Sequence, residues 1–441
     1  MKVAFLTLGC KVNYYETEKM IADFQARGFE VTDFNKGADV YIVNTCTVTN
    51  IADRKSRKML RRAKKMNPDG VVAAVGCYVE SGGDELKKDS AVDVFFSNAD
   101  KPEIVPKLIE YMEQAGRQQC PEAGADGMTS VNGMPDGRTR KYIKVQDGCN
   151  QFCSYCMIPY VRGGGVLTSR EEEDVLEEVR HIAEHGFKEV VLTGIHLSSY
   201  GVNRSGARSF VEAKGAPLVS LLQKLGGISG IERIRLGSLE PRIICDAFLE
   251  GIASVDKLCP HFHLSLQSGC DATLRRMNRH YTAAEYAACC GRIRDFFCNP
   301  AITTDVIVGF PGETDEEFEA TRNFVNEVGL ADVHVFPYSV RNGTRAAKME
   351  NQVSPEIRRR RADLLIREAA RLRQCYVTAF IGNDERVLFE EVRGMDGEDF
   401  LVGHNERYVL FRVPVPEAES RGFAENEIHT ISVETGNLIY E

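Results

Sequence analysis

Three cysteines at spacing C-x3-C-x2-C constrain this chain more than any other feature. They are Cys149, Cys153 and Cys156, and they come directly after a stretch typical of a β-strand. A structural zinc site usually has four ligands, commonly in two C-x2-C pairs, and this loop has no fourth cysteine or histidine. Three thiolates on a cubane [4Fe–4S] cluster leave one iron without a protein ligand. The motif therefore predicts a cluster whose open iron can bind a small molecule that accepts an electron.

This motif resembles the cluster-binding signature of the radical S-adenosylmethionine (SAM) superfamily. Tyr155, directly before the last cysteine, fits the same pattern. The resemblance implies that SAM chelates the open iron through its amino and carboxylate groups. One electron would then cleave a C–S bond of SAM and produce a 5′-deoxyadenosyl radical. The alternative is three buried thiols on a helical turn.

Length and composition indicate a globular protein of two or three domains. The chain has 441 residues, of which 43% are hydrophobic and 27% are charged. Met1–Leu6 is typical of an opening strand rather than of a signal peptide, and no apolar run reaches membrane-spanning length. We therefore expect a cytoplasmic protein with no membrane partner. Its 14 cysteines then predict ligands and core residues instead of disulfides. Five of them are expected in the core: Cys245, Cys289, Cys290, Cys298 and Cys375.

The net charge of −9 argues against non-specific binding of nucleic acid over the whole surface. Two basic blocks, Arg54–Lys65 and Arg358–Arg373, nevertheless concentrate positive charge locally. Each block alone is typical of a solvated helix face. The two together leave a local site for a polyanion as an equal alternative.

Residues 1–115 alternate short apolar strands with amphipathic helices, which predicts a doubly wound parallel sheet. The expected elements are strands Lys2–Leu8, Val40–Val43 and Val71–Val75, and helices Tyr15–Arg27, Ala52–Lys65 and Pro102–Glu113. Each strand is followed at the same place by a cysteine, namely Cys10, Cys46 or Cys77. Because parallel strands share one carboxyl edge, these thiols should meet there. We infer a second three-cysteine iron–sulfur site, against the alternative of three unrelated loop residues.

Residues 139–350 contain six expected strands separated by helical patterns, which predicts an open, partial (β/α)6 barrel. The strands are Tyr142–Val145, Glu189–Leu192, Arg233–Leu236, His261–Leu266, Thr303–Val308 and Val333–Pro337. Functional residues of barrels lie on the loops after the strands, and the C-x3-C-x2-C motif follows the first one.

Glycine or polar residues follow the other strands of this barrel, where they are expected to contact SAM. They are Thr193, Gly194, Glu240, Gln267 and Gly309. Arg279 is a candidate partner for an anionic group, with an ordinary surface role as the alternative. His261 and His263 are two residues apart on one expected strand, so their side chains point to the same face and both could line the barrel. A catalytic role for them is the less favoured interpretation.

The remaining segments connect or follow these two domains. Residues 116–138, rich in glycine and polar groups, predict a linker that includes Cys120, which is not expected to be a ligand. Residues 351–375 predict a connecting basic helix. Residues 376–441 predict a small β-barrel of the kind that binds RNA, or else a structural cap. Its expected strands are Glu385–Glu391, Phe400–Val402, Tyr408–Val413, Glu427–Val433 and Asn437–Tyr440.

The order of these parts resembles the methylthiotransferase family, with the C-terminal module similar to a TRAM domain. Four stretches match closely: Thr7–Asn13, Val43–Thr49, Gly76–Tyr78 and Cys259–Gly269. They are most similar to the branch that acts on N6-threonylcarbamoyladenosine next to the anticodon of tRNA. They are less similar to the branches for isopentenyladenosine or a ribosomal protein. The chain departs from the family pattern at Gln151, where asparagine is usual, and at Gly163–Leu167, which interrupts a stretch that is often more basic.

The resemblance implies two [4Fe–4S] clusters and two uses of SAM. One SAM would methylate a sulfur species held at the site of Cys10, Cys46 and Cys77. A second SAM, at the other site, would give the radical that abstracts hydrogen from C2 of the adenine, where the methylthio group is delivered. A C2–H bond has no useful acidity, so acid–base catalysis would not suffice. The target base would leave the anticodon-loop stack.

The implied partners are the tRNA anticodon stem-loop, a sulfur donor, and a reductant such as flavodoxin or ferredoxin. Two alternatives remain open. The same chemistry could act on another tRNA adenosine or on a ribosomal protein. Alternatively, the chain could be a non-enzymatic RNA-binding protein with zinc at its cysteines, and iron analysis separates this reading from the first.

Overall fold

The computed structural model describes residues 1–116 and 138–440, apart from the side chains of residues 84 and 85. These residues form two compact units. The first unit comprises 1–116, 148–166 and 339–347, and the second comprises 138–147, 167–338 and 348–440. The expected linker at 116–138 lies outside the described residues except for its two end residues, and Cys120 lies outside them as well. No helix in the described ranges is long and apolar enough to span a membrane.

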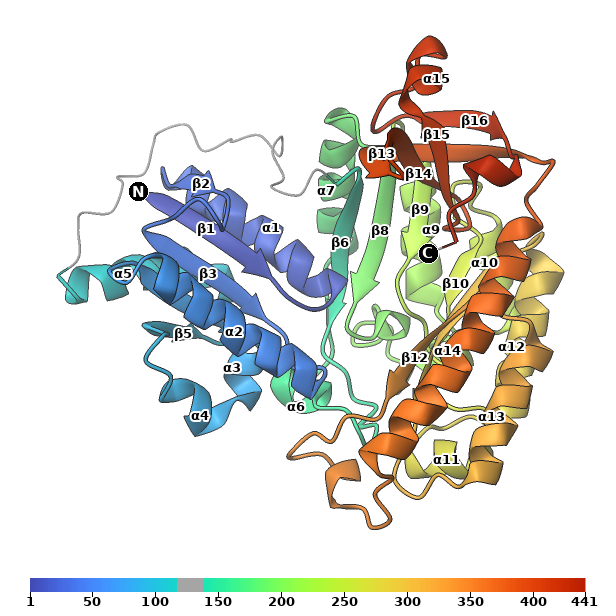
Figure 1. The fold of residues 1–441 in the computed structure, drawn as a ribbon, viewed down its shortest axis with the longest axis horizontal. Coiled ribbons are helices and arrows are strands. Elements are labelled where there is room, and N and C mark those ends of the chain that lie inside the picture. The colour runs from blue at the N-terminus through green and yellow to red at the C-terminus, as the bar shows by residue number, and fades with distance from the viewer. Residues whose placement is uncertain (117–137, 441) are drawn as a thin grey trace. The chain divides into compact units, whose positions relative to one another are not determined.

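The first unit is built on a five-stranded parallel sheet in the order β2-β1-β3-β4-β5, which confirms the expected parallel sheet (Figure 1). The strands are β1 (Lys2–Thr7), β2 (Glu30–Thr32), β3 (Val40–Thr45), β4 (Val71–Gly76) and β5 (Val94–Phe96). Alternate residues of β3 and β4 point to opposite faces. Ile42 packs with residues of helices α1 (Lys11–Ala26) and α5 (Ile104–Gln114), and Val43 packs with α2 (Asn50–Met66). Two short helices, α3 (Cys77–Ser81) and α4 (Gly83–Lys87), follow β4.

The second unit contains a curled sheet of six parallel strands, at the expected places in the sequence. They are β6 (Arg140–Asp147), β8 (Glu189–Gly194), β9 (Arg233–Leu236), β10 (His261–His263), β11 (Ala301–Val308) and β12 (Asp332–Pro337). Single parallel bridges, such as Leu239 to Leu264, continue the sheet from β9 to β10. A two-residue strand, β7 (Thr168–Ser169), lies antiparallel beside β6. Within the described ranges β12 does not pair with β6, so the barrel is open.

Helices cover one face of this curled sheet (Figure 1). They include α7 (Glu172–Glu184), α9 (Ala216–Gly226), α10 (Asp246–Ala253), α12 (Ala283–Phe296), α13 (Asp315–Val328) and α14 (Pro355–Thr378). On β11, Ile302, Val306 and Val308 are buried in the core with residues of these helices. Strand alternation therefore turns Thr303 and Asp305 to the opposite, inner face of the barrel.

The C-terminal strands form a four-stranded antiparallel sheet in the order β15-β14-β13-β16. They are β13 (Asp384–Met395), β14 (Glu398–Asn405), β15 (Leu410–Pro414) and β16 (Ile428–Ser432). The prediction of a fifth strand at Asn437–Tyr440 is wrong. That segment follows a 3-10 turn (Thr435–Asn437) and makes one bridge, from Leu438 to Phe411. The short helix α15 (Val415–Ser420) was not expected.

Two buried arginines of β9 fasten this C-terminal sheet to the barrel. Arg233 donates to the backbone oxygen of His404 at 3.0 Å, and Arg235 donates to that of Glu406 at 2.9 Å. Both side chains are 1% exposed, and Arg235 also pairs with Glu189 at 2.9 Å. A charge buried this deeply requires its partner, because removing one member leaves the other without compensation.

Several arginines of the second basic block have partners inside the second unit. Arg361 is buried against Glu313 at 2.7 Å, and Arg358 donates to the backbone oxygen of Tyr338 at 2.6 Å. Arg373 pairs with Asp332 at 2.8 Å. These charges hold α14 against the barrel, which reduces the charge available to an external polyanion.

The prediction of buried cysteines is only partly confirmed. Cys289 and Cys290 are buried on α12, whereas Cys245 is partly exposed just before α10. Cys298 and Cys375 are exposed, so the expectation of a core position was wrong for both. Cys298 lies past the end of α12, and Cys375 lies on the solvent side of α14.

Candidate functional site

Cys10, Cys46 and Cys77 lie at the carboxyl ends of three neighbouring strands, β1, β3 and β4. Cys10 caps the start of α1, Cys46 follows the last residue of β3, and Cys77 begins α3. Gly9 has a φ of 103°, and a Cβ built there would lie 2.7 Å from the Cys46 sulfur. The turn before Cys10 therefore passes directly against Cys46, a closeness that only glycine permits.

Two buried asparagines, Asn13 and Asn44, hold these strand ends together. Asn13 donates through Nδ2 to the backbone oxygens of Leu8 and Thr45, at 2.7 and 2.9 Å. Asn44 donates through Nδ2 to the backbone oxygen of Asn13 at 2.9 Å. The turn after β1 is thus tied to the end of β3, which fixes Cys10 relative to Cys46. Both asparagines stand in the stretches that match the methylthiotransferase pattern, but their scaffolding role was not foreseen.

Arg162 contacts the first three-cysteine site and was not among the predicted site residues. It is 2% exposed, and its Nε donates to the Cys77 sulfur at 3.3 Å. Its other nitrogens donate to Glu16 at 2.8 Å and to Asn13 Oδ1 at 2.8 Å. Lys101 pairs with the same Glu16. A single arginine before three glycines has the appearance of a surface residue, so only the fold reveals this contact.

The chemistry of the first three thiols suits a cationic centre. Burial raises the pKa of Cys46 to about 11, and the neighbouring Cys10 and Cys77 push this pKa in the same direction. Burial therefore opposes ionisation of the Cys46 thiol unless positive charge lies beside its sulfur. Metal ions supply that charge and deprotonate coordinating thiols. The donor set, the close backbone and the Arg162 contact therefore fit an iron–sulfur cluster.

Cys149, Cys153 and Cys156 occupy the irregular loop between β6 and α6 (Ile158–Val161), and all three are partly exposed. The loop turns tightly: the Cys156 nitrogen donates to the Cys153 oxygen at 3.0 Å, and the Ile158 nitrogen donates to the Cys156 sulfur at 3.4 Å. Backbone donors to sulfur are typical of iron–sulfur loops. Tyr155 is half-buried in the same loop. All three candidate ligands of this cluster lie in one loop, so their relative positions do not depend on the pairing of separate strands.

The expected SAM contacts of the barrel lie at or beyond the carboxyl ends of its strands. Thr193 and Gly194 end β8, and Thr193 is buried. Glu240 is 4% exposed after β9, where its carboxylate accepts from Arg242 Nε at 2.7 Å. That pairing occupies part of the acceptor capacity that SAM would use.

The other expected contacts show unusual backbone or local hydrogen bonds. Gln267 has a φ of 70°, a conformation uncommon for a residue with a side chain. Gly309 has a φ of 69°, and its nitrogen donates to Glu313 at 2.6 Å. Arg279 lies past α11 (Asp271–Arg276) and donates to the hydroxyl of Tyr281 at 3.0 Å. SAM contacts by these residues stay a prediction.

An open, polar cavity of about 410 Å³ lies beside the first three-cysteine site. Its lining comes from α2, the α3 region and the segment near residue 341: Asn50, Asp53, Arg54, Arg57, Tyr78, Ser81, Gly82, Arg341 and Asn342. Arg341 pairs with Asp53 at 2.6 Å, and the other positive groups at the cavity are Arg54 and Arg57, of which Arg57 also donates to the hydroxyl of Tyr78. A cavity of this chemistry can accept an anionic group such as a phosphate.

An open, curled parallel sheet with a three-cysteine loop after its first strand is the arrangement of the radical SAM class of enzymes. Residues 143–325 match the Radical SAM superfamily, and residues 2–97 match a family described as Uncharacterized protein family UPF0004. The fold is similar to a radical SAM methyltransferase, TsrM of Kitasatospora setae, with a TM-score of 0.55. That likeness covers 76% of this chain and 72% of the other at 14% identity, and it concerns the fold alone.

Named relatives extend over almost the whole chain. It is 38% identical to threonylcarbamoyladenosine tRNA methylthiotransferase MtaB of Bacillus subtilis (strain 168), over 92% of this chain and 89% of that protein. It is 35% identical to tRNA-2-methylthio-N(6)-dimethylallyladenosine synthase of Syntrophus aciditrophicus (strain SB), over 81% and 77%. The chain belongs to the radical SAM methylthiotransferase family. Membership implies a [4Fe–4S] cluster and SAM, and it is consistent with a second cluster.

Proposed function

We propose that this protein transfers a methylthio group to C2 of N6-threonylcarbamoyladenosine, next to the anticodon of tRNA. The observation that carries the proposal is the presence of two separate three-cysteine sites, each with fewer ligands than a cubane has irons. The 38% identity to a protein named for this reaction supports the choice of substrate. The domain assignment belongs to the proposal: an auxiliary-cluster domain at 1–115, a radical-SAM (β/α)6 domain at 139–350, and a TRAM-like small barrel at 376–441.

The cysteines of this chain would hold two [4Fe–4S] clusters, one at Cys149, Cys153 and Cys156 and one at Cys10, Cys46 and Cys77. When bound, the clusters and SAM supply the radical chemistry that an unreactive C2–H bond requires. Arg162 donates a hydrogen bond to Cys77 and keeps that sulfur oriented. Tyr155, Thr193, Gly194, Glu240, Gln267, Arg279 and Gly309 are proposed to bind and orient SAM.

A tRNA anticodon stem-loop is the proposed substrate, with the C-terminal sheet as one contact surface. Arg54 and Arg57 at the cavity of the first unit provide positive charge for a phosphate. The base would have to leave its stack to expose C2, as other enzymes that modify bases require. A sulfur donor and a reductant such as flavodoxin or ferredoxin complete the proposed set of partners.

The dimethylallyladenosine-type substrate is a second candidate, because a relative named for it is 35% identical. Tandem mass spectrometry of tRNA nucleosides from a deletion strain and its complemented parent separates the two. Loss of the 2-methylthio threonylcarbamoyl nucleoside alone supports the first proposal. Retention of that nucleoside eliminates it, and loss of the 2-methylthio dimethylallyl nucleoside instead assigns the second candidate.

A further inference from the structure

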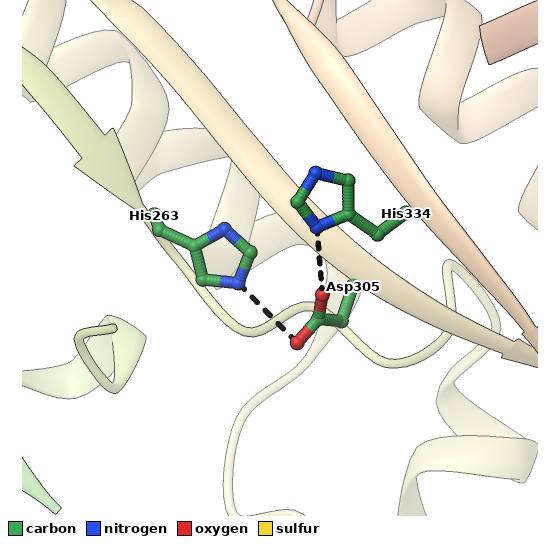
Figure 2. Close-up of side chains that lie close together, drawn as sticks. All are labelled: His263, Asp305 and His334. Carbon is green, nitrogen blue, oxygen red and sulfur yellow. Dashed lines mark ion pairs between the residues drawn. The ribbon is translucent and has the colours of Figure 1, made fainter. Parts of the chain in front are cut away.

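Three side chains that commonly bind metals meet on the inner face of the barrel. His263 lies on β10, Asp305 on β11 and His334 on β12, and Figure 2 shows both imidazoles directed at the carboxylate. Asp305 and His334 are direct cross-strand partners in the parallel register. One ligand atom from each of the three lies within 4.8 Å of the other two. The sheet therefore brings two imidazoles and one carboxylate to one point.

The distances at this point are longer than those of ordinary charged hydrogen bonds. His263 Nε2 lies 3.3 Å from one oxygen of Asp305, and His334 Nδ1 lies 3.3 Å from the other. A hydrogen bond between an imidazolium and a carboxylate is usually about 2.7–2.9 Å long. Two ligands on one tetrahedral zinc ion, each about 2.0–2.2 Å from the metal, lie about 3.4 Å apart. The observed separations are close to that value.

Both histidines also have a polar group beside the ring nitrogen that faces away from Asp305. His263 Nδ1 lies 2.9 Å from Thr303 Oγ1, and His334 Nε2 lies 3.8 Å from an oxygen of Asp332. Asp332 is held in turn by Arg373 at 2.8 Å. Metal-binding histidines usually contact a hydroxyl, carbonyl or carboxylate through the second nitrogen, which fixes the tautomer and the ring. This arrangement leaves His263 Nε2 and His334 Nδ1 as the nitrogens available to an ion.

We propose that His263, Asp305 and His334 bind one divalent transition-metal cation of the Zn²⁺ type. Two imidazoles and a carboxylate suit such an ion, whereas the thiolates of the two cysteine sites suit iron–sulfur clusters. Three protein ligands leave a fourth coordination position open, which is the pattern of catalytic rather than structural zinc sites. Access is available, because the side chain of His334 is 51% exposed and that of Asp305 is 31% exposed. The site stands independently of the proposed tRNA substrate.

The test uses full-length protein with both iron–sulfur clusters loaded, so that the six cysteine ligands are occupied. Anaerobic equilibrium dialysis against Zn²⁺, with metal counted by mass spectrometry, is compared for the wild type, His334→Ala and Asp305→Asn. We expect one zinc per chain, and at least about tenfold weaker binding in both variants, since even losing an outer partner of a ligand costs about 10–100-fold. His429→Ala is the matched control, because it breaks a histidine–carboxylate pair with Glu427 outside this site.

X-ray absorption at the zinc edge supplies the second measurement. A first shell of nitrogen and oxygen at about 2.0–2.2 Å is expected, while sulfur would appear at about 2.3 Å. A sulfur shell, zinc binding that both variants retain, or no zinc binding by the wild type would each overturn the proposal. The three side chains would then form only an ion-pair network. His334 is half exposed, so its truncation should not prevent folding.

Discussion

The two cysteine sites of this protein are built in opposite ways. Cys149, Cys153 and Cys156 come from one loop of eight residues, which folds through its own backbone hydrogen bonds. Cys10, Cys46 and Cys77 follow three different strands and share one edge of the sheet only because β1, β3 and β4 are neighbours there. The loop site therefore depends on local sequence, and the sheet site depends on the register and packing of a whole domain. Damage to the sheet should empty one site and spare the other.

The largest effect is expected from removing one ligand of each site. Cys10→Ala and Cys149→Ala should each lose about four of about eight irons, because either cluster loses one of its three thiolates. Both variants should lose methylthiotransfer completely. Anaerobic iron and sulfide analysis makes the measurement, with the exposed Cys298→Ala as control. If Cys10→Ala retained all of about eight irons, Cys10 would not be a cluster ligand, and the protein would not have the two contrasting cluster sites.

Asn13→Ala should affect the iron content of the sheet site but not that of the loop site, although it changes no candidate ligand. It leaves the backbone oxygens of Leu8 and Thr45 without their donor, at a cost of about 2–6 kcal/mol in the free energy of unfolding. Iron should fall at the sheet site alone, which electron paramagnetic resonance of the two clusters resolves. Asn67→Ala is matched, since its amide also donates to a backbone oxygen of the first unit, that of Ala38. The control should destabilise the protein yet retain both clusters.

Arg162→Lys should have a smaller and more specific effect. Lysine keeps the positive charge but cannot donate at once to Cys77, Glu16 and Asn13 as the guanidinium does. We expect full iron content and a lower reduction potential for the sheet-site cluster, because a hydrogen bond to its sulfur stabilises the reduced form. Redox titration followed by electron paramagnetic resonance measures both clusters. Equal shifts at the two sites would contradict a contact specific to Cys77.

The smallest effect concerns the charged cavity, which borders the sheet site through Tyr78. Arg57→Ala should weaken binding of an anticodon stem-loop and reduce the salt dependence of log K by about 0.7–0.9, the range for one phosphate contact. Arg62→Ala, on the same helix but outside the cavity, should bind as the wild type does. Fluorescence anisotropy at several salt concentrations makes the comparison. Identical slopes for the two variants would exclude this cavity from RNA binding.

The sequence predicts the features of this fold that repeat or that lie close together along the chain. The strand rhythm predicts the parallel sheet and the six barrel strands, and the match of residues 143–325 confirms the resemblance to the radical SAM superfamily, while the ligand role of Cys149, Cys153 and Cys156 stays a prediction. The three-residue strands β2 and β5 were not expected, because so short a segment carries no periodicity. The opposite error occurred at residues 437–440, where a strand was predicted and none is present. An apolar segment next to a sheet need not join it.

Contacts set by tertiary packing could not be predicted. Arg162 reaches Cys77 across 85 residues of sequence, and nothing near it indicates that partner. Alternation on β10 placed His263 inside the barrel, yet Asp305 and His334 went unnoticed. Their meeting depends on the register between strands, which a single sequence does not contain. Cys298 looked like a core residue because it lies in an apolar helical pattern, but α12 ends at Phe296 and leaves Cys298 exposed beyond it.

The attachment of the C-terminal sheet has a consequence for engineering. Arg233 and Arg235 recognise carbonyl groups of the main chain near residues 404–406, and every amino acid provides a carbonyl. Most of the receiving turn could thus be rewritten, or a different small β module grafted there, as long as its peptide oxygens occupy the same points and it keeps the equivalents of Glu390, which pairs with Arg140, and Tyr408, which stacks on Arg235. The joint thus combines a tolerant part, which recognises only peptide oxygens, with a demanding part, which needs the carboxylate of Glu390 and the ring of Tyr408.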